Sequence, residues 1–174
     1  MYKLIFVLLL SITANATILN LVNGKIEAHT EVFGDSTINP ETEKIVTNLT
    51  MDDSIESISG KFEIEAISFV SDNKDRDKHM YEILHIAESP KISFIVNSIS
   101  KNEEAYIVGG DLTMNGVTKH IFSQANIVEK NLFLDLDGSF SIKLTDFNLE
   151  PPTMFFLTVR DLIDIKYSFH FEEK

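Results

Sequence analysis

Apolar and polar residues alternate along most of this chain, and a period of two is typical of β-strands that bury one face. In segment 163–171 every second residue is apolar, and segment 132–144 repeats the pattern with Leu132 and Leu144 in the inward set. Gly138 falls in the middle of that set, which predicts a bend or a β-bulge. Further strands are predicted at 61–69, 92–98, 106–114 and 117–128, and more weakly at 18–32 and 44–51. The chain is therefore predicted to be all-β, with about eight strands.

The dipeptide Asn115-Gly116 predicts a tight hairpin between two of these strands. A type I′ turn requires a positive φ at both central residues, which Asn and Gly tolerate best. Because a two-residue turn fixes the register, Met114 is expected opposite Val117, and Asp111 opposite His120 on the outer face.

Only one segment has helical spacing. Residues 74–87 place Met80, Ile83, Leu84 and Ala87 on one face. Asp72-Asn73 offers an N-cap before this segment, and Pro90 is expected to end it.

Many amphipathic strands with one helix favour either a β-sandwich or an up-and-down barrel. The inward face is apolar throughout, and the chain has 13 Phe and no Trp. An eight-stranded barrel is just wide enough to be filled by its own side chains or to hold one small ligand. The pattern alone leaves these alternatives open.

The first 16 residues have the features of a secretory signal peptide. Lys3 precedes an apolar run that is too short to span a bilayer, and Ala14-Asn15-Ala16 forms an A-x-A cleavage site. We therefore expect cleavage after Ala16, which leaves 17–174 as one domain.

The chain has no Cys, which excludes disulfides, thiolate metal sites and a lipid-modified Cys after the signal. A mature protein without a stable membrane anchor is expected, and the bacterial periplasm is the expected compartment. Eukaryotic secretion is the alternative, in which Asn48-Leu49-Thr50 would be a glycosylation sequon.

Charge and motifs exclude several classes of function. The formal net charge of −12 is opposite to the basic footprint that nucleic-acid binding needs. No nucleophile elbow, phosphate loop or HExxH motif is present, so we expect neither an enzyme nor a cofactor. His79 could join Asp75 and Glu82 on one helix face, but ion pairing is favoured over a metal site. Arg76 could meet a ligand head group, although neutralisation by Asp75 and Asp77 is favoured.

Five segments in order carry a resemblance to a known family: RDKHMYEIL (76–84), SPKISF (89–94), GGDLTMNGVTKHI (109–121), TDFNLEPP (145–152) and VRDLIDIKYSF (159–169). On these segments the chain resembles the YceI-like, polyisoprenoid-binding family of exported bacterial proteins. The resemblance implies a lipocalin-like, eight-stranded antiparallel barrel with one short helix. It also implies a periplasmic binder or carrier of an isoprenoid or other long-chain lipid. The acidic net charge favours an uncharged head group, such as a quinone, an alcohol or an amide.

If the barrel holds a lipid, its tail must contact apolar side chains that point inward, and period-two alternation identifies these. The predicted lipid-binding residues are Phe62, Ile64, Phe94, Val96, Tyr106, Leu112, Phe140, Ile142, Ile165, Tyr167 and Phe169. The alternative is a stress-related structural barrel whose interior is filled and holds no ligand. The sequence leaves a monomer and a homodimer both open.

Overall fold

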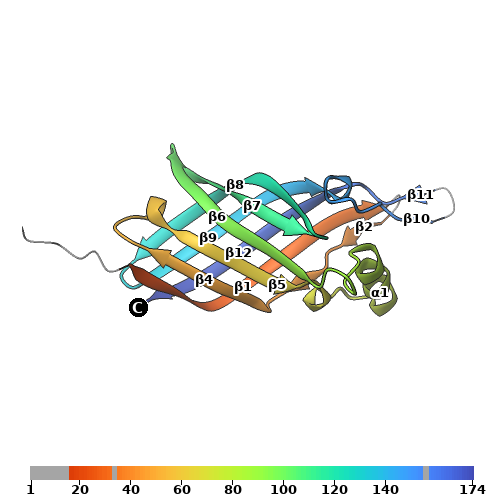
Figure 1. The fold of residues 1–174 in the computed structure, drawn as a ribbon, viewed down its shortest axis with the longest axis horizontal. Coiled ribbons are helices and arrows are strands. Elements are labelled where there is room, and N and C mark those ends of the chain that lie inside the picture. The colour runs from red at the N-terminus through yellow and green to blue at the C-terminus, as the bar shows by residue number, and fades with distance from the viewer. Residues whose placement is uncertain (1–15, 33–34, 155–156) are drawn as a thin grey trace, which may run out of the picture.

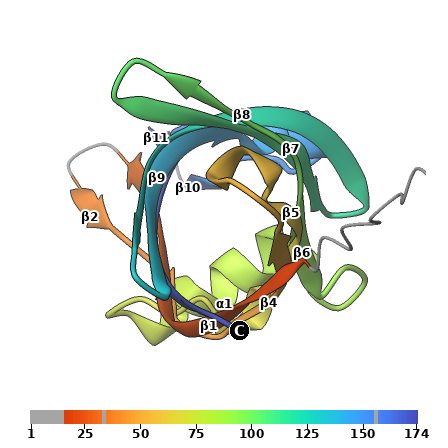
Figure 2. The same ribbon diagram turned by 90° about the vertical axis from the view of Figure 1, so that its left-hand side faces the viewer.

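The computed structural model describes residues 16–32, 35–154 and 157–174. Within these ranges eight long strands form a closed antiparallel barrel, as predicted. The strands are β1 (Thr17–Val32), β4 (Ile45–Met51), β5 (Ser59–Glu65), β6 (Lys91–Asn102), β7 (Ala105–Met114), β8 (Val117–Lys130), β9 (Phe133–Lys143) and β12 (Leu162–Glu173). Each pairs with the next in this order, and β12 pairs with β1 to close the ring, which Figure 2 shows end-on.

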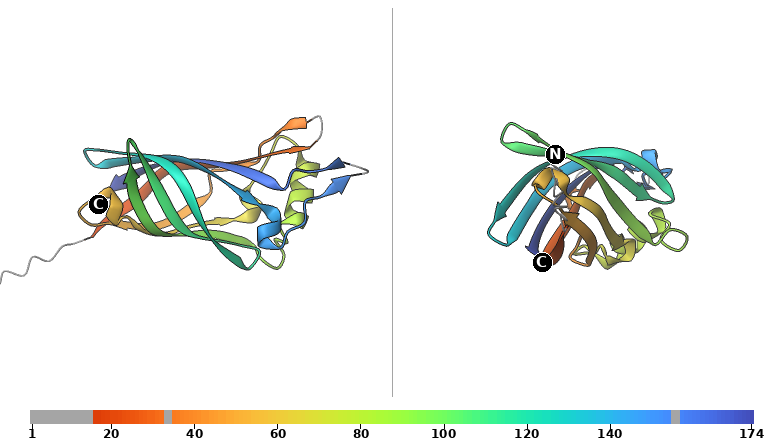
Figure 3. Two further views of the ribbon diagram at one scale, coloured as in Figure 1. Left: turned by 90° about the horizontal axis from the view of Figure 1, so that it is seen from above. Right: turned by 60° about the vertical axis from the view of Figure 1, so that its left-hand side comes forward.

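The shorter elements gather mainly at one end of the elongated barrel. The helix α1 (Lys74–Ile83) and the strands β2 (Asp35–Ile38), β10 (Thr153–Met154) and β11 (Leu157–Thr158) lie there, opposite the C-terminus (Figure 1). The β10–β11 pair projects beyond the barrel (Figure 3). The remaining short elements are β3 (Glu41–Thr42) and the 3₁₀ turns η1 (Ile55–Ser57), η2 (Ala66–Ser68) and η3 (Leu144–Phe147). No helix in the described part of the chain is long and apolar enough to cross a bilayer.

The predicted hairpin between β7 and β8 is confirmed. Asn115 and Gly116 have φ values of 50° and 71°, as a type I′ turn requires. Met114 pairs with Val117, and Asp111 pairs with His120. The His120 Nδ1 and Asp111 Oδ1 atoms lie 2.8 Å apart on the outer face.

The helix begins where the sequence predicts and ends earlier. The Asn73 side chain accepts hydrogen bonds from the backbone N–H groups of Asp75 (3.0 Å) and Arg76 (3.1 Å), which makes it the N-cap. The prediction that the helix extends to residue 87 and ends at Pro90 is wrong. The chain leaves the helix after Ile83, and His85 takes a left-handed conformation with φ of 50°.

Three details of the predicted strands are also wrong. The strand predicted at 61–69 ends at Glu65, because η2 turns the chain there. Of the bend or β-bulge predicted at Gly138, the bulge is absent, since its pairings with Ala125 and Tyr167 lie in unbroken registers. Leu132 lies in the turn before β9 and is 62% exposed instead of facing inward.

The bulges that curve the barrel lie elsewhere. In β1 the pairing with β12 shifts between Leu21 and Asn23, and the β6–β7 pairing shifts between Val96 and Ser98. Each such shift adds one residue to a strand and increases its local bend and twist. Closure into a barrel depends on this curvature.

Two apolar clusters stabilise the barrel at different heights. The larger one fills the end opposite α1, where Phe171 and Leu134 are fully buried. The smaller one surrounds Phe147 and Leu149, beside the β7–β8 turn and Leu84. Phe94 packs against both clusters, and the space between them is the candidate site.

Candidate functional site

The barrel interior contains a cavity of about 1050 Å³ between the larger apolar cluster and α1. Pockets for drug-sized ligands have volumes of about 300–1,000 Å³, so this space could hold a long molecule. Part of the cavity wall is aromatic: Phe62 and Phe169 line it, and their ring centroids lie 4.9 Å apart. Phe171 packs beneath them, with centroid distances of 6.4 and 6.1 Å to those rings.

Ten of the eleven predicted lipid-binding residues line this cavity. They are Phe62, Ile64, Phe94, Val96, Leu112, Phe140, Ile142, Ile165, Tyr167 and Phe169. Tyr106 does not line it. Its side chain is 8% exposed and packs within the larger cluster, one inward position beyond Val108, which lines the deep part of the cavity. Contact of these residues with a lipid stays a prediction.

Several inward-facing side chains are only partly buried, as expected for a hollow barrel. Phe94, Phe140, Ile165 and Tyr167 all have intermediate exposure although they face the interior. Sequence reasoning missed further lining residues from β1, among them Ile26 and Ala28. Their period-two spacing within 18–32 was the signal that could have identified them.

The helix α1 lies across the open end and contributes Arg76, Met80 and Ile83 to the lining. Asp77 fixes the start of the helix. Asp77 is 7% exposed, and its carboxylate accepts hydrogen bonds from the backbone N–H (2.9 Å) and the hydroxyl (2.6 Å) of Ser71.

Tyr81 attaches the next turn of the helix to the barrel, because its hydroxyl donates to the Phe69 carbonyl over 2.7 Å. Burial raises the pKa of Tyr81, and the nearby carboxylate of Asp77 adds to this effect. Side-chain hydrogen bonds therefore join the helix at two points to the segment that precedes it.

The charged residues of α1 pair with neighbours on or next to the helix. Arg76 forms an ion pair with Asp72, with Nη1 and Oδ1 3.9 Å apart. The Asp75 carboxylate forms an ion pair with Lys78 Nζ at 3.0 Å, and the Asp77 carboxylate accepts a hydrogen bond from the Ser71 hydroxyl.

The expected ion pair between His79 and Glu82 is present at 3.5 Å. Across the described residues, no group of three His, Cys, Asp or Glu side chains is arranged to hold a metal ion. The helix surface is thus an ion-paired face.

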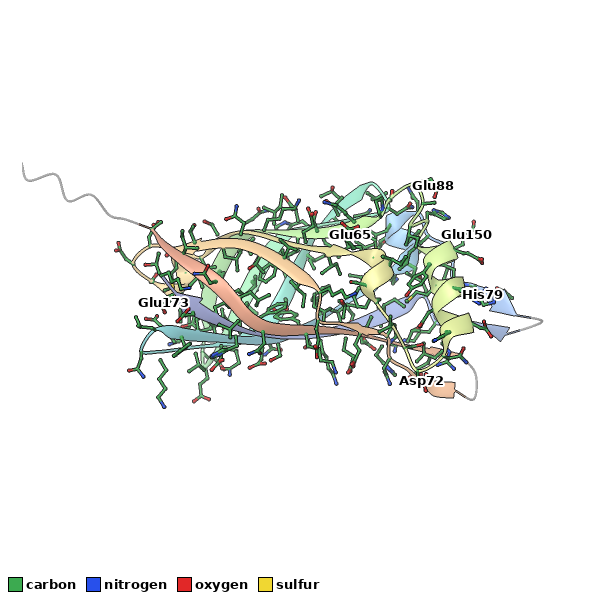
Figure 4. All side chains as sticks on the ribbon, turned by 90° about the horizontal axis from the view of Figure 1, so that it is seen from below. Glu65, Asp72, His79, Glu88, Glu150 and Glu173 are labelled. Carbon is green, nitrogen blue, oxygen red and sulfur yellow. The ribbon has the colours of Figure 1, made fainter. Side chains whose placement is uncertain are left out.

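Several labelled acidic side chains lie near the α1 end of the barrel. Figure 4 shows Asp72, Glu88 and Glu150 at the α1 end, and Glu173 at the opposite end.

One polar feature of the cavity wall was missed by sequence reasoning. The Ser123 hydroxyl from β8 lies 2.7 Å from the Tyr167 hydroxyl from β12, and both residues line the cavity. Burial raises the pKa of Tyr167, so its hydroxyl is neutral near pH 7. The interior thus combines a long apolar wall with one buried pair of hydroxyl groups.

Comparison with known proteins agrees with this architecture. A model of the YceI-like domain family matches residues 19–171. The UPF0312 protein of Yersinia enterocolitica is 31% identical over 94 residues, which cover 49% of each chain. Protein YceI of Escherichia coli O157:H7 is 31% identical over 97 residues, 50% of each chain. The chain thus spans about half the length of the curated relatives it matches.

Solved structures show the same fold at low sequence identity. BcnA of Burkholderia cenocepacia superposes with a TM-score of 0.75 at 19% identity, covering 84% of this chain and 95% of BcnA. A YceI protein of Campylobacter jejuni gives a TM-score of 0.70 at 21% identity, covering 80% of this chain and 87% of that protein. A polyisoprenoid-binding domain of Saccharophagus degradans gives a TM-score of 0.61 at 12% identity, covering 91% of this chain and 98% of that domain. Since the family match extends over nearly the whole barrel, the chain belongs to the YceI-like family.

Proposed function

We propose that this protein is a periplasmic binder or carrier that holds an isoprenoid or other long-chain lipid in its barrel cavity. The observation that carries the proposal is the cavity of about 1050 Å³ with an apolar wall. A related fold in Saccharophagus degradans is described as a polyisoprenoid-binding domain, which supports the same class of ligand here. A binding role without catalysis is part of the proposal.

Burial of the hydrocarbon chain is the expected source of affinity. Each methylene group transferred from water contributes about 0.8 kcal/mol. A tail of about a dozen carbons would then contribute roughly 10 kcal/mol before the entropic costs of association. Apolar side chains such as Phe94, Phe140 and Ile165 supply the contacts along the cavity.

An uncharged head group fits the electrostatics of the protein. The net charge of −12 disfavours a diphosphate. A quinone, an alcohol or an amide would carry no such penalty. A neutral long-chain lipid is therefore the proposed class of ligand.

Export is the second part of the proposal. Residues 1–16 have the charge, apolar run and A-x-A site of a signal peptide, and removal after Ala16 would leave the chain from Thr17, where β1 begins. Sequencing the N-terminus of the native protein tests this part, and an intact Met1 in the purified protein would contradict it.

The test of binding is organic extraction of the native, purified protein followed by mass spectrometry. We expect a co-purifying long-chain molecule at a substantial fraction of one per chain. The extracted protein should regain the same molecule from a lipid extract, because an empty cavity is still lined by apolar groups. An empty extract, with no uptake by the folded protein, would instead support the structural role with no ligand.

A further inference from the structure

Two hydroxyl groups form a buried polar point on the apolar cavity wall. Ser123 is 3% exposed, and its Oγ atom lies 2.7 Å from the Tyr167 hydroxyl oxygen. Both side chains line the cavity, at a height where the neighbouring inward positions of β12 are Ile165 and Phe169. A polar group of a ligand at this height would meet these two hydroxyls.

Two backbone carbonyls near Ser123 offer acceptors for its hydrogen. Its Oγ lies 3.1 Å from the Ser139 carbonyl oxygen and 3.4 Å from the Gln124 carbonyl oxygen. Carbonyl oxygens only accept, and we assign the single Ser123 hydrogen to the backbone. Ser123 then accepts the hydrogen of Tyr167, which leaves the Tyr167 oxygen as an acceptor with lone pairs available.

The surrounding strands hold the Tyr167 ring in a fixed position. The ring stacks on Phe169 with a centroid distance of 5.3 Å and an interplanar angle of 17°. Its hydroxyl lies over Gly138, where an added Cβ would come within 2.3 Å of the Tyr167 oxygen. Ser123 directly precedes Gln124, where the pairing of β8 with β9 begins opposite Ser139. The acceptor is therefore positioned before any ligand binds.

The pair lies in the lower part of the cavity, away from α1. Tyr167 is one inward position above Phe169, which is about 7 Å along a strand. Two further inward positions of β12, Ile165 and Ile163, extend from Tyr167 toward the open end and also line the cavity. A ligand whose polar group reached Tyr167 would place its tail along these residues.

We propose that the Tyr167–Ser123 pair binds the hydroxyl group of an uncharged long-chain or isoprenoid alcohol. This inference rests on the proposed lipid-binding function. The ligand O–H donates to Tyr167, Tyr167 donates to Ser123, and Ser123 donates to the Ser139 carbonyl. Such a chain of hydrogen bonds polarises each member and strengthens the next. The ligand therefore enters with its hydroxyl group first, and its tail points toward α1.

The test compares two isomers that have the same atoms. Dodecanol carries an O–H donor, whereas methyl undecyl ether has an oxygen that can only accept. Each is titrated against mature protein freed of lipid and loaded with Nile red, and displacement of the dye gives the affinity. We expect dodecanol to bind the wild-type protein about fivefold more tightly, which is the value of one net hydrogen bond.

The variant Tyr167→Phe keeps the ring and removes the acceptor. The preference for dodecanol should then be lost, because its buried O–H has no acceptor, and the affinity for the ether should match the wild-type value. Ser123→Ala provides an independent arm, because it frees the Tyr167 hydrogen for donation to the ether oxygen. We expect this variant to bind the ether more tightly than the wild-type protein does. The ratio of the alcohol affinity to the ether affinity should therefore be smaller than in the wild-type protein.

Each other outcome has a definite meaning. Equal binding of both isomers to the wild-type protein overturns the inference and leaves the lipid-binding proposal intact. A Tyr167→Phe protein that loses affinity for both isomers equally shows a purely structural role and also overturns it. If neither isomer displaces the dye from folded wild-type protein, the proposed function fails together with the inference.

Discussion

The residue Gly138 shows how one missing side chain shapes the cavity wall. An added Cβ would lie 2.3 Å from the Tyr167 hydroxyl oxygen and 2.8 Å from the Gln124 carbonyl oxygen. The backbone of Gly138 stays in regular strand pairing on both sides. Gly is thus needed here for the close approach of Tyr167, and not for an unusual backbone conformation.

We predict that Gly138→Ala destabilises the protein by about 2 kcal/mol, the usual cost of overpacking a filled site. The aromatic ring must move, and it is stacked on Phe169. Urea unfolding followed by circular dichroism measures the change. Ser139→Ala is the matched control, because its side chain is exposed on the next residue and should change stability by less than about 0.5 kcal/mol. A Gly138→Ala protein as stable as the control would show that the wall has room to relax.

At the scale of single residues, the sequence predicted which side chains face the barrel interior, but it did not predict which side chains contact each other. Period-two alternation identified Phe94 and Ile142 as inward because each strand is regular around them. The contact between Ser123 and Tyr167 joins β8 and β12, which are separated in the sheet by β9. No local sequence pattern encodes such a pair, because its geometry depends on the space next to Gly138, where a Cβ atom would clash with the Tyr167 hydroxyl.

At the scale of elements, turns with strict backbone requirements were the most predictable. Asn115-Gly116 fixed both the turn type and the register of β7 and β8. The end of α1 was mispredicted because no Gly follows it, and His85 takes the left-handed conformation that Gly usually supplies. The two-residue strands β10 and β11 were not predicted, since such short pairings leave no periodic signal.

We predict that Asn73→Ala loosens α1 without loosening the barrel. The Asn73 side chain accepts hydrogen bonds from two backbone N–H groups that have no partner within the helix. Loss of such a cap costs about 1 kcal/mol. Hydrogen exchange should therefore be faster by about fivefold in Lys74–Ile83 and unchanged in β7 and β8. Lys74→Ala, an exposed neighbour, should leave both rates unchanged, and equal exchange in the two variants would refute the capping role.

At the scale of the whole molecule, the open question for the sequence was whether the barrel is filled. An eight-stranded barrel lies at the limit where side chains can fill the interior. Here the larger cluster fills one end, and the remaining space stays hollow at about 1050 Å³. Strand number and apolar content do not decide this, because the bulges in β1 and β6 set the local curvature. Only the assembled barrel defines the cavity.

The last prediction tests the cavity as the lipid site through Phe94. This residue lines the hollow and packs against both apolar clusters, so a carboxylate at its position would lie in the path of a lipid tail. The Phe94→Asp protein should lose its co-purified lipid. The new carboxylate needs water around it, and a bound lipid tail would displace that water. Ser100→Asp, on an exposed position of the same strand, should retain the lipid.

The Phe94 substitution also removes apolar contacts, so a second variant separates folding from binding. Ala28 faces the hollow from β1, opposite Ile165 in the pairing with β12. Ala28→Phe places a ring in the empty space without removing any existing contact. We expect a folded barrel with unchanged circular dichroism that retains much less lipid, measured by extraction and mass spectrometry. If folded Ala28→Phe and Phe94→Asp proteins both keep the full amount of lipid, the ligand does not occupy the barrel interior.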